Sequence, residues 1–155
     1  MDKFIYYYTG PVQTGKTTRI AEWTKKNNCT GIVAPIIDGK RHLKIISSGE
    51  KKLLETEANE NSIIIGKFKF DRSVFEWGRE KLLAEYELKP EWLVIDEFGK
   101  LELKDEGLEP AISRIISRWQ KEKNINLLII VRDYLVNEFI QKFDKHGITF
   151  KEFSI

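Results

Sequence analysis

The chain has 155 residues, of which 41% are hydrophobic and 32% are charged, and this composition excludes a collagen-like or intrinsically disordered protein. The length suits one globular domain that can bury a core of its own. The 26 basic and 24 acidic side chains leave a net charge of +2, so the overall charge does not indicate a nucleic-acid or membrane partner.

Cysteine content and hydropathy indicate the compartment. Cys29 is the single cysteine, so no intrachain disulfide can form, which is typical of a reducing environment. No stretch approaches the ~18 consecutive apolar residues of a membrane-spanning helix. Residues 1–8 contain too short an apolar run for a signal peptide. We therefore expect a cytoplasmic protein.

Strand and helix signals alternate along the first half of the chain. Aromatic and β-branched runs bounded by glycine predict strands, and Asp38-Gly39 is a strong hairpin signal. The predicted elements are a strand (4–8), a helix (16–26), a strand (31–37), its hairpin partner (43–46), a short helix (51–57) and a buried strand (62–65).

The same alternation continues in the second half. Ser73 and Glu76 have the spacing of a capping box, and the helix that they open stops before Pro90. The later predicted elements are a strand (92–95), an amphipathic helix through 112–119, a buried strand (127–131), a helix (136–143) capped by Asp133, and a strand (148–153).

A glycine-rich loop lies between the first predicted strand and the first predicted helix. Residues 10–17 fit the pattern G-x-x-x-x-G-K-[ST] at every fixed position. In such a loop the backbone N–H groups and the helix N-terminus surround a phosphate. The predicted nucleotide-binding residues are Gly10, Pro11, Val12, Gln13, Thr14, Gly15, Lys16, Thr17 and Thr18. Lys16 would stabilise charge on the β- and γ-phosphates, and the Thr17 hydroxyl would ligate Mg²⁺, the predicted cofactor.

Two adjacent carboxylates follow the apolar strand predicted at 92–95. We interpret Asp96 as a metal residue beside Thr17, and Glu97 as the catalytic residue that polarises the attacking water. Taken alone, the pair also fits a strand that leaves the core for solvent. A glutamate directly after the metal aspartate is typical of P-loop proteins in which another strand separates the two motif strands. Residues 127–131 are predicted to be that strand.

Arg132 follows the strand predicted at 127–131. Ligands of open α/β sheets bind at the carboxyl ends of the strands, so Arg132 is a candidate catalytic residue that contacts the γ-phosphate. The alternative is a surface arginine paired with Asp133. Lys67 could likewise contact the phosphate or be a surface residue, and the surface interpretation is favoured.

These patterns together predict a three-layer α/β fold of the P-loop NTPase type. A mainly parallel sheet would have helices on both faces and an antiparallel hairpin at one edge. No composition shift divides the chain, so we expect residues 1–155 to form a single domain.

The residues after the acidic pair carry a family resemblance. Residues 96–103, D-E-F-G-K-L-E-L, resemble the D-E-[IF]-G-K-[ML]-E-L signature of a family of small nucleoside-triphosphatases, known from thermophiles and as the human cancer-related nucleoside-triphosphatase. The resemblance covers roughly residues 3–135. The chain departs from the pattern of this family in three ways. Gln13 replaces a glycine, Lys67 replaces an arginine, and the chain is short around residues 40–60.

The resemblance implies Mg²⁺-dependent hydrolysis of ATP, GTP and other NTPs with loose base preference. It assigns phosphate and metal binding to Lys16 and Thr17, the metal to Asp96, and the water to Glu97. Lys100 and Glu102 are motif members to which it assigns no role.

Two other functions use the same phosphate loop. A small-molecule or polynucleotide kinase would add an acceptor site, and a nucleotide-dependent binding switch would hydrolyse slowly and bind a partner. For the leading hypothesis the expected partner is an NTP substrate, and we expect a monomer with no membrane partner and no clear nucleic-acid binding.

Overall fold

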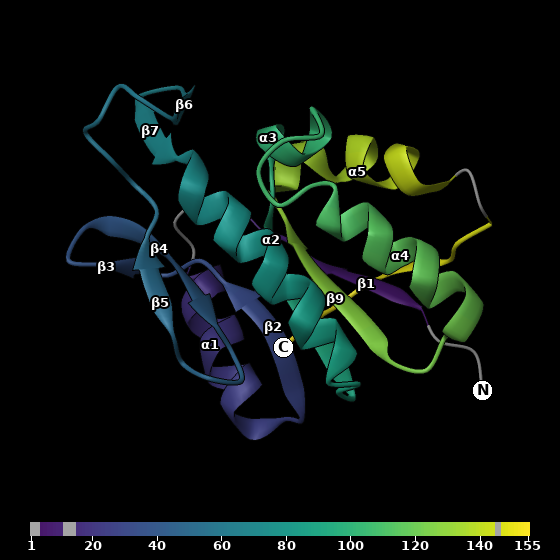
Figure 1. Cartoon of the computed structure of the whole chain (residues 1–155). Coiled ribbons are helices and arrows are strands. Elements are labelled where there is room, and N and C mark those ends of the chain that lie inside the picture. The colour runs from purple at the N-terminus through teal and green to yellow at the C-terminus, as the bar shows by residue number, and fades with distance from the viewer. Residues whose placement is uncertain (1–3, 11–14, 145–146) are drawn as a thin grey trace.

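The computed structural model describes residues 4–10, 15–144 and 147–155, and its centre is a mostly parallel sheet with helices on both faces (Figure 1). The strands are β1 (Ile5–Tyr8), β2 (Cys29–Val33), β3 (Ile36–Ile37), β4 (Lys40–Ile45), β5 (Lys51–Leu53), β6 (Ser62–Ile65), β7 (Phe68–Asp71), β8 (Trp92–Phe98), β9 (Asn126–Val131) and β10 (Phe150–Glu152). The helices are α1 (Lys16–Lys26), α2 (Arg72–Glu87), α3 (Lys100–Leu103), α4 (Ala111–Glu122) and α5 (Val136–Phe143), with a 3₁₀ turn at Asp133–Leu135.

The strand order of the main sheet is β10-β1-β9-β8-β2-β4-β3, with β5 paired to β4. The strands from β10 to β2 are parallel, whereas β3, β4 and β5 add an antiparallel edge. This topology confirms the predicted α/β fold and the hairpin at Asp38-Gly39. It also places β9 between β1 and β8, so the prediction that a strand separates the two motif strands is confirmed.

Alternate residues of the central strands face opposite layers, as the period of a strand requires. Leu93 and Ile95 of β8 pack into the large core beneath α2, α4 and α5, whereas Val94 packs into the smaller core beneath α1. Both faces are therefore covered by helices, which explains why β8 and β9 are continuous apolar runs. None of the described helices is both long enough and apolar enough to cross a membrane.

A close backbone approach fixes the spacing of β2 and β8. Gly31 has φ of +127°, and a Cβ built on it would lie 2.0 Å from the carbonyl oxygen of Val94. The Gly31 N–H donates to the buried carboxylate of Glu85 on α2 at 3.1 Å. Glu85 also accepts from the Ser47 N–H at 3.0 Å and the Ser47 hydroxyl at 2.5 Å. These contacts join α2 to β2, the strand beside β8.

Two predicted elements differ from the structure between β4 and α2. The helix predicted over residues 51–57 is wrong, because residues 51–53 form β5, an edge strand joined to β4 by a turn with Gly49 at φ +77°. The strand at residues 62–65 is present, but its predicted burial is wrong. Among the described residues it pairs with β7 alone, in a separate two-stranded sheet, and Ile64 is 65% exposed.

Helix starts also differ from the predicted caps. The carboxylate of Asp71 accepts from the Ser73 N–H at 2.9 Å, so Asp71 rather than Ser73 caps α2. Asp133 does not cap α5, because a 3₁₀ turn intervenes and its carboxylate accepts from the adjacent Tyr134 N–H. The short helix α3, which directly follows the acidic strand end, was not predicted.

Candidate functional site

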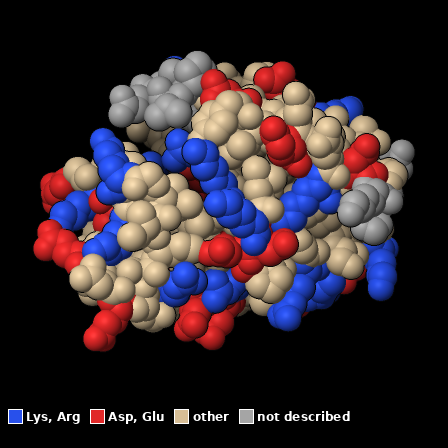
Figure 2. All heavy atoms as spheres, turned by 90° about the horizontal axis from the view of Figure 1, so that it is seen from above, with Lys and Arg blue, Asp and Glu red and all other residues tan. Residues whose placement is uncertain are grey.

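The predicted site residues converge at the carboxyl edge of the parallel strands. β1 leads into Gly10, β8 ends with Asp96 and Glu97, and β9 leads into Arg132. This edge lies at the top of Figure 1, and Figure 2 views it from above. Acidic and basic side chains are interspersed over the face drawn there.

The structure describes part of the phosphate loop. Pro11, Val12, Gln13 and Thr14 lie outside the described residues, as does the side chain of Lys16. Gly15 precedes α1 in the left-handed region, with φ of +80°, a conformation that glycine adopts without strain. Thr17 is half-buried and Thr18 is exposed in the first turn of α1.

Thr17 and Asp96 meet, as the sequence predicts. The Thr17 hydroxyl lies 3.4 Å from Oδ2 of Asp96 and donates to it, although the two residues are 79 positions apart. Asp96 is fully buried, and its Oδ2 also accepts from the Ala34 N–H at 3.1 Å. Burial and two donors hold this carboxylate in one orientation beside the first turn of α1.

The chemistry of these oxygen atoms fits Mg²⁺. Adjacent ligands of an octahedral Mg²⁺ lie about 2.9 Å apart, given metal–oxygen distances of ~2.05 Å, and the 3.4 Å pair comes near that separation. Within the described part of the chain, no group of three or more His, Cys, Asp or Glu could hold a metal. Thr17 and Asp96 could thus supply oxygen atoms while phosphates and water complete the shell, as Mg²⁺ prefers.

Glu97 pairs with Arg132. The guanidinium Nη2 lies 2.9 Å from Oε1 of Glu97, and the side chains are 29% and 19% exposed. The register between β8 and β9 shifts at this point, since Asp96 is opposite Ile130 but Phe98 is opposite Val131. Such a bulge redirects the extra side chain, and here Glu97 turns toward the end of β9. Arg132 therefore pairs with Glu97. The alternative interpretation, a surface arginine, predicted a pair with Asp133 instead.

Glu102 closes the loop that follows the acidic pair. Its buried carboxylate accepts from the Gly99 N–H and from the Leu108 N–H, both at 2.9 Å. Burial raises the pKa of Glu102 to about 7, and the two backbone donors act in the opposite direction. Both carboxylate oxygens of Glu102 accept hydrogen bonds from the backbone of this loop. This motif residue therefore has a structural role that the sequence did not reveal.

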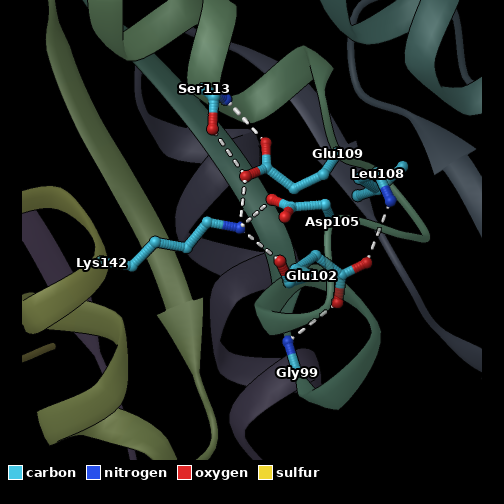
Figure 3. Close-up of polar contacts among 7 residues, drawn as sticks. All are labelled: Gly99, Glu102, Asp105, Leu108, Glu109, Ser113 and Lys142. Atoms are coloured by element: carbon cyan, nitrogen blue, oxygen red, sulfur yellow. Dashed lines mark hydrogen bonds and ion pairs between the residues drawn. The ribbon is translucent and has the colours of Figure 1, made fainter.

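A polar network then anchors the loop to α5 (Figure 3). Lys142 Nζ donates to the Glu102 carbonyl at 2.5 Å and pairs with Asp105 at 2.9 Å and with Glu109 at 2.7 Å. Glu109 is buried and also accepts from the N–H and hydroxyl of Ser113. Burial alone would lower the pKa of Lys142, but its hydrogen bonds with Glu109 and Asp105 raise it above its ordinary value.

We expect Lys142→Ala to destabilise the protein by about 3 kcal/mol, because it leaves the carboxylate of Glu109 buried without its cation. For a chain of this length the loss corresponds to a fall in Tm of roughly 6–12 °C, measured by calorimetry. Lys104→Ala, an exposed lysine on the same loop, is the matched control and should leave Tm unchanged. Equal Tm values for the two variants would show that the network contributes nothing to stability.

A cavity of about 620 Å³ adjoins the acidic strand end. It reaches from Asp96, Glu97 and Arg132 to the hairpin formed by β6 and β7. No sequence motif predicts this cavity, because its walls come from β4, the hairpin and α3, which are far apart in the chain. Phe68 and Phe70, on the same face of β7, were the available signal.

Comparisons with known proteins agree with this geometry. The sequence profile of the NTPase family matches residues 5–153. Among solved structures, the fold is similar to THEP1 from the hyperthermophile Aquifex aeolicus, with 18% identity, a TM-score of 0.68, and coverage of 96% of this chain and 89% of that chain. The comparison with curated proteins found no match for the chain. The chain therefore belongs to the NTPase family, which consists of nucleoside triphosphatases.

Proposed function

We propose that the protein is a Mg²⁺-dependent enzyme that hydrolyses the terminal phosphate of ATP, GTP and other NTPs with loose base preference. The observation that carries the proposal is the contact of Thr17 with Asp96 at 3.4 Å, with Glu97 next in sequence. This contact joins the phosphate loop to the acidic strand end. We further propose that residues 1–155 act as one domain and as a monomer.

The proposed roles follow from charge and position. The backbone N–H groups of residues 10–18 and the Lys16 ammonium would bind the phosphates. Thr17 and Asp96 would hold Mg²⁺, which when bound neutralises charge on the β- and γ-phosphates. Glu97 would orient a water molecule and accept its proton as the oxygen attacks phosphorus.

Arg132 would change partner during this cycle. In the structure its guanidinium pairs with Glu97, and a γ-phosphate beside the pair would offer a second anionic partner. Transfer of Arg132 to the phosphate would stabilise the charge that develops there and would leave the Glu97 carboxylate available to water. Positioning and charge stabilisation supply most of the rate of phosphoryl transfer.

Arg132→Ala should lower kcat by about 10²-fold or more, while the Kd for a non-hydrolysable Mg²⁺–NTP analogue changes by less than about threefold. The reason is that a contact with charge developing on the γ-phosphate acts chiefly in the transition state. Arg114→Ala, on α4 and away from the site, is the control. A wild-type kcat in Arg132→Ala would return Arg132 to the role of a surface arginine.

A panel of nucleotides tests the proposed substrate range. We expect kcat/KM for ATP, GTP, CTP and UTP to differ by less than about 100-fold, which corresponds to about 2.7 kcal/mol. The physical reason is that binding through phosphates and metal does not distinguish bases. Phosphate release with each NTP and Mg²⁺ measures the ratio directly. A larger preference for one base would contradict the proposed loose specificity.

A further inference from the structure

The cavity beside Glu97 is much larger than the attacking water requires. A water molecule occupies about 30 Å³ of liquid, whereas the cavity measures about 620 Å³. Pockets of roughly 300–1,000 Å³ hold small organic ligands. Its lining contains Asp96, Glu97 and Arg132 at one end, so a ligand in it would lie against the residues proposed to act on the γ-phosphate.

The lining contributed by the β6–β7 hairpin includes aromatic side chains as well as Lys67. Phe68 and Phe70 of β7 stack with ring centroids 6.1 Å apart and planes 3° apart. Phe68 is 43% exposed, and Ile36 on the neighbouring hairpin is 60% exposed. Leu54 also lines the cavity. Exposed apolar side chains around a cavity favour a ligand with an apolar body.

Arg41 supplies a fixed cation on the cavity wall. Its Nη1 donates to the Ala34 carbonyl at 2.6 Å, and the Ala34 N–H donates to Asp96. The guanidinium is thus held by the same residue that orients the metal carboxylate. Arg41 is half-buried and takes part in none of the ion pairs found among the described residues. The planar Arg41 guanidinium presents several N–H donors in this position, an arrangement that suits a carboxylate or phosphate group.

We propose that this cavity binds a phosphoryl acceptor, namely a small hydroxyl compound with an apolar ring and one anionic group. The ring would lie against Phe68, the anionic group would bind Arg41, and the hydroxyl would face Glu97. The proposal rests on the proposed NTP site, and it adds phosphotransfer to hydrolysis.

The transfer step balances without a further reactant. The acceptor hydroxyl oxygen forms a bond to the γ-phosphorus while the bond from that phosphorus to the β,γ-bridging oxygen breaks. The hydroxyl proton passes to the Glu97 carboxylate, and the nucleoside diphosphate leaves with the bridging oxygen. The products are a phosphate monoester and the diphosphate, and water competes for the same γ-phosphate.

The test uses γ-labelled ATP, Mg²⁺ and two acceptors that fit this class: 4-hydroxyphenylacetate and 4-hydroxybenzoate. We expect label on at least one acceptor as well as in inorganic phosphate. Phe68→Ala and Arg41→Gln should each lower the ratio of transfer to hydrolysis by about tenfold. Ile64→Ala is the matched control, because Ile64 is 65% exposed on the same hairpin and outside the cavity lining.

Three results would overturn the proposal. The first is label in inorganic phosphate alone with every acceptor, which leaves the hydrolase intact. The second is a Phe68→Ala variant whose KM rises for some NTPs and not others, which would assign the cavity to the base of the NTP. The third is the absence of label from both inorganic phosphate and every acceptor, which would remove the proposed NTP site and this inference together.

Discussion

Glu97→Gln should bind Mg²⁺–ATP with near wild-type affinity and hydrolyse it about 10²–10⁴-fold more slowly, the range of a general-base contribution. Glutamine keeps the size of the side chain and an oxygen that can accept from Arg132 at the present 2.9 Å contact. It lacks the negative charge that draws a proton from water. Single-turnover hydrolysis and binding of a non-hydrolysable analogue measure the two effects separately.

The neighbouring acid gives the matched comparison. Asp96→Asn should weaken the dependence on Mg²⁺, because a neutral amide is a poorer partner for a hard cation and its water shell. If Glu97→Gln turns over within about threefold of wild type while Asp96→Asn is inactive, the role assigned to Glu97 is wrong. Glu102 would then be tested next, even though its carboxylate is occupied by the Gly99 and Leu108 N–H groups.

Gly31→Ala should destabilise the protein by at least about 4 kcal/mol, a loss that few single substitutions reach. The new methyl carbon would lie 2.0 Å from the Val94 carbonyl oxygen, which is backbone and cannot rotate away. The φ of +127° adds strain of about 1–3 kcal/mol for a residue with a Cβ. β2 and β8 would have to separate, which would displace Asp96 from the Ala34 N–H.

Gly49→Ala separates the clash from the backbone strain. Gly49 also has positive φ, at +77°, but a Cβ there would meet nothing within 4 Å. Gly49→Ala should lower the free energy of unfolding by about 1 kcal/mol, the cost of the left-handed conformation alone. Urea unfolding of both variants measures the difference. Similar losses for Gly31→Ala and Gly49→Ala would mean that the sheet absorbs the methyl group, contrary to the close approach described above.

The centre of the fold could be predicted because its signals are local and strong. β8 and β9 are continuous apolar runs, as strands covered on both faces must be. The acidic pair after β8 indicates an intervening strand, and β9 is that strand, between β1 and β8. The contact of Thr17 with Asp96 follows from that topology.

The antiparallel edge was harder to predict for a physical reason. Residues 51–53 are exposed, so no apolar period distinguishes an edge strand from a short helix, and pairing with β4 decides the outcome. The apolar side chains of residues 62–65 predict burial in the core, but among the described strands β6 pairs with β7 alone.

The surroundings of the site depend on contacts between distant residues. Sequence spacing identified Glu97 and Arg132 separately, but their ion pair depends on the bulge in β8. Lys142 lies 40 residues from Glu102, whose carbonyl it binds, and no motif includes it. The cavity beside Glu97 arises from several elements at once, so no single segment predicts it.

The most direct measurement is the inorganic phosphate released from ATP by the purified protein, with Mg²⁺ present or replaced by EDTA, beside the Lys16→Ala variant. The variant removes the formal charge of the phosphate loop and controls for contaminating phosphatases. We predict sustained release over many turnovers by the wild-type protein with Mg²⁺, and background release in the other three conditions. Equal release by Lys16→Ala, or no release by the wild-type protein with Mg²⁺, would contradict the proposed hydrolysis at this site.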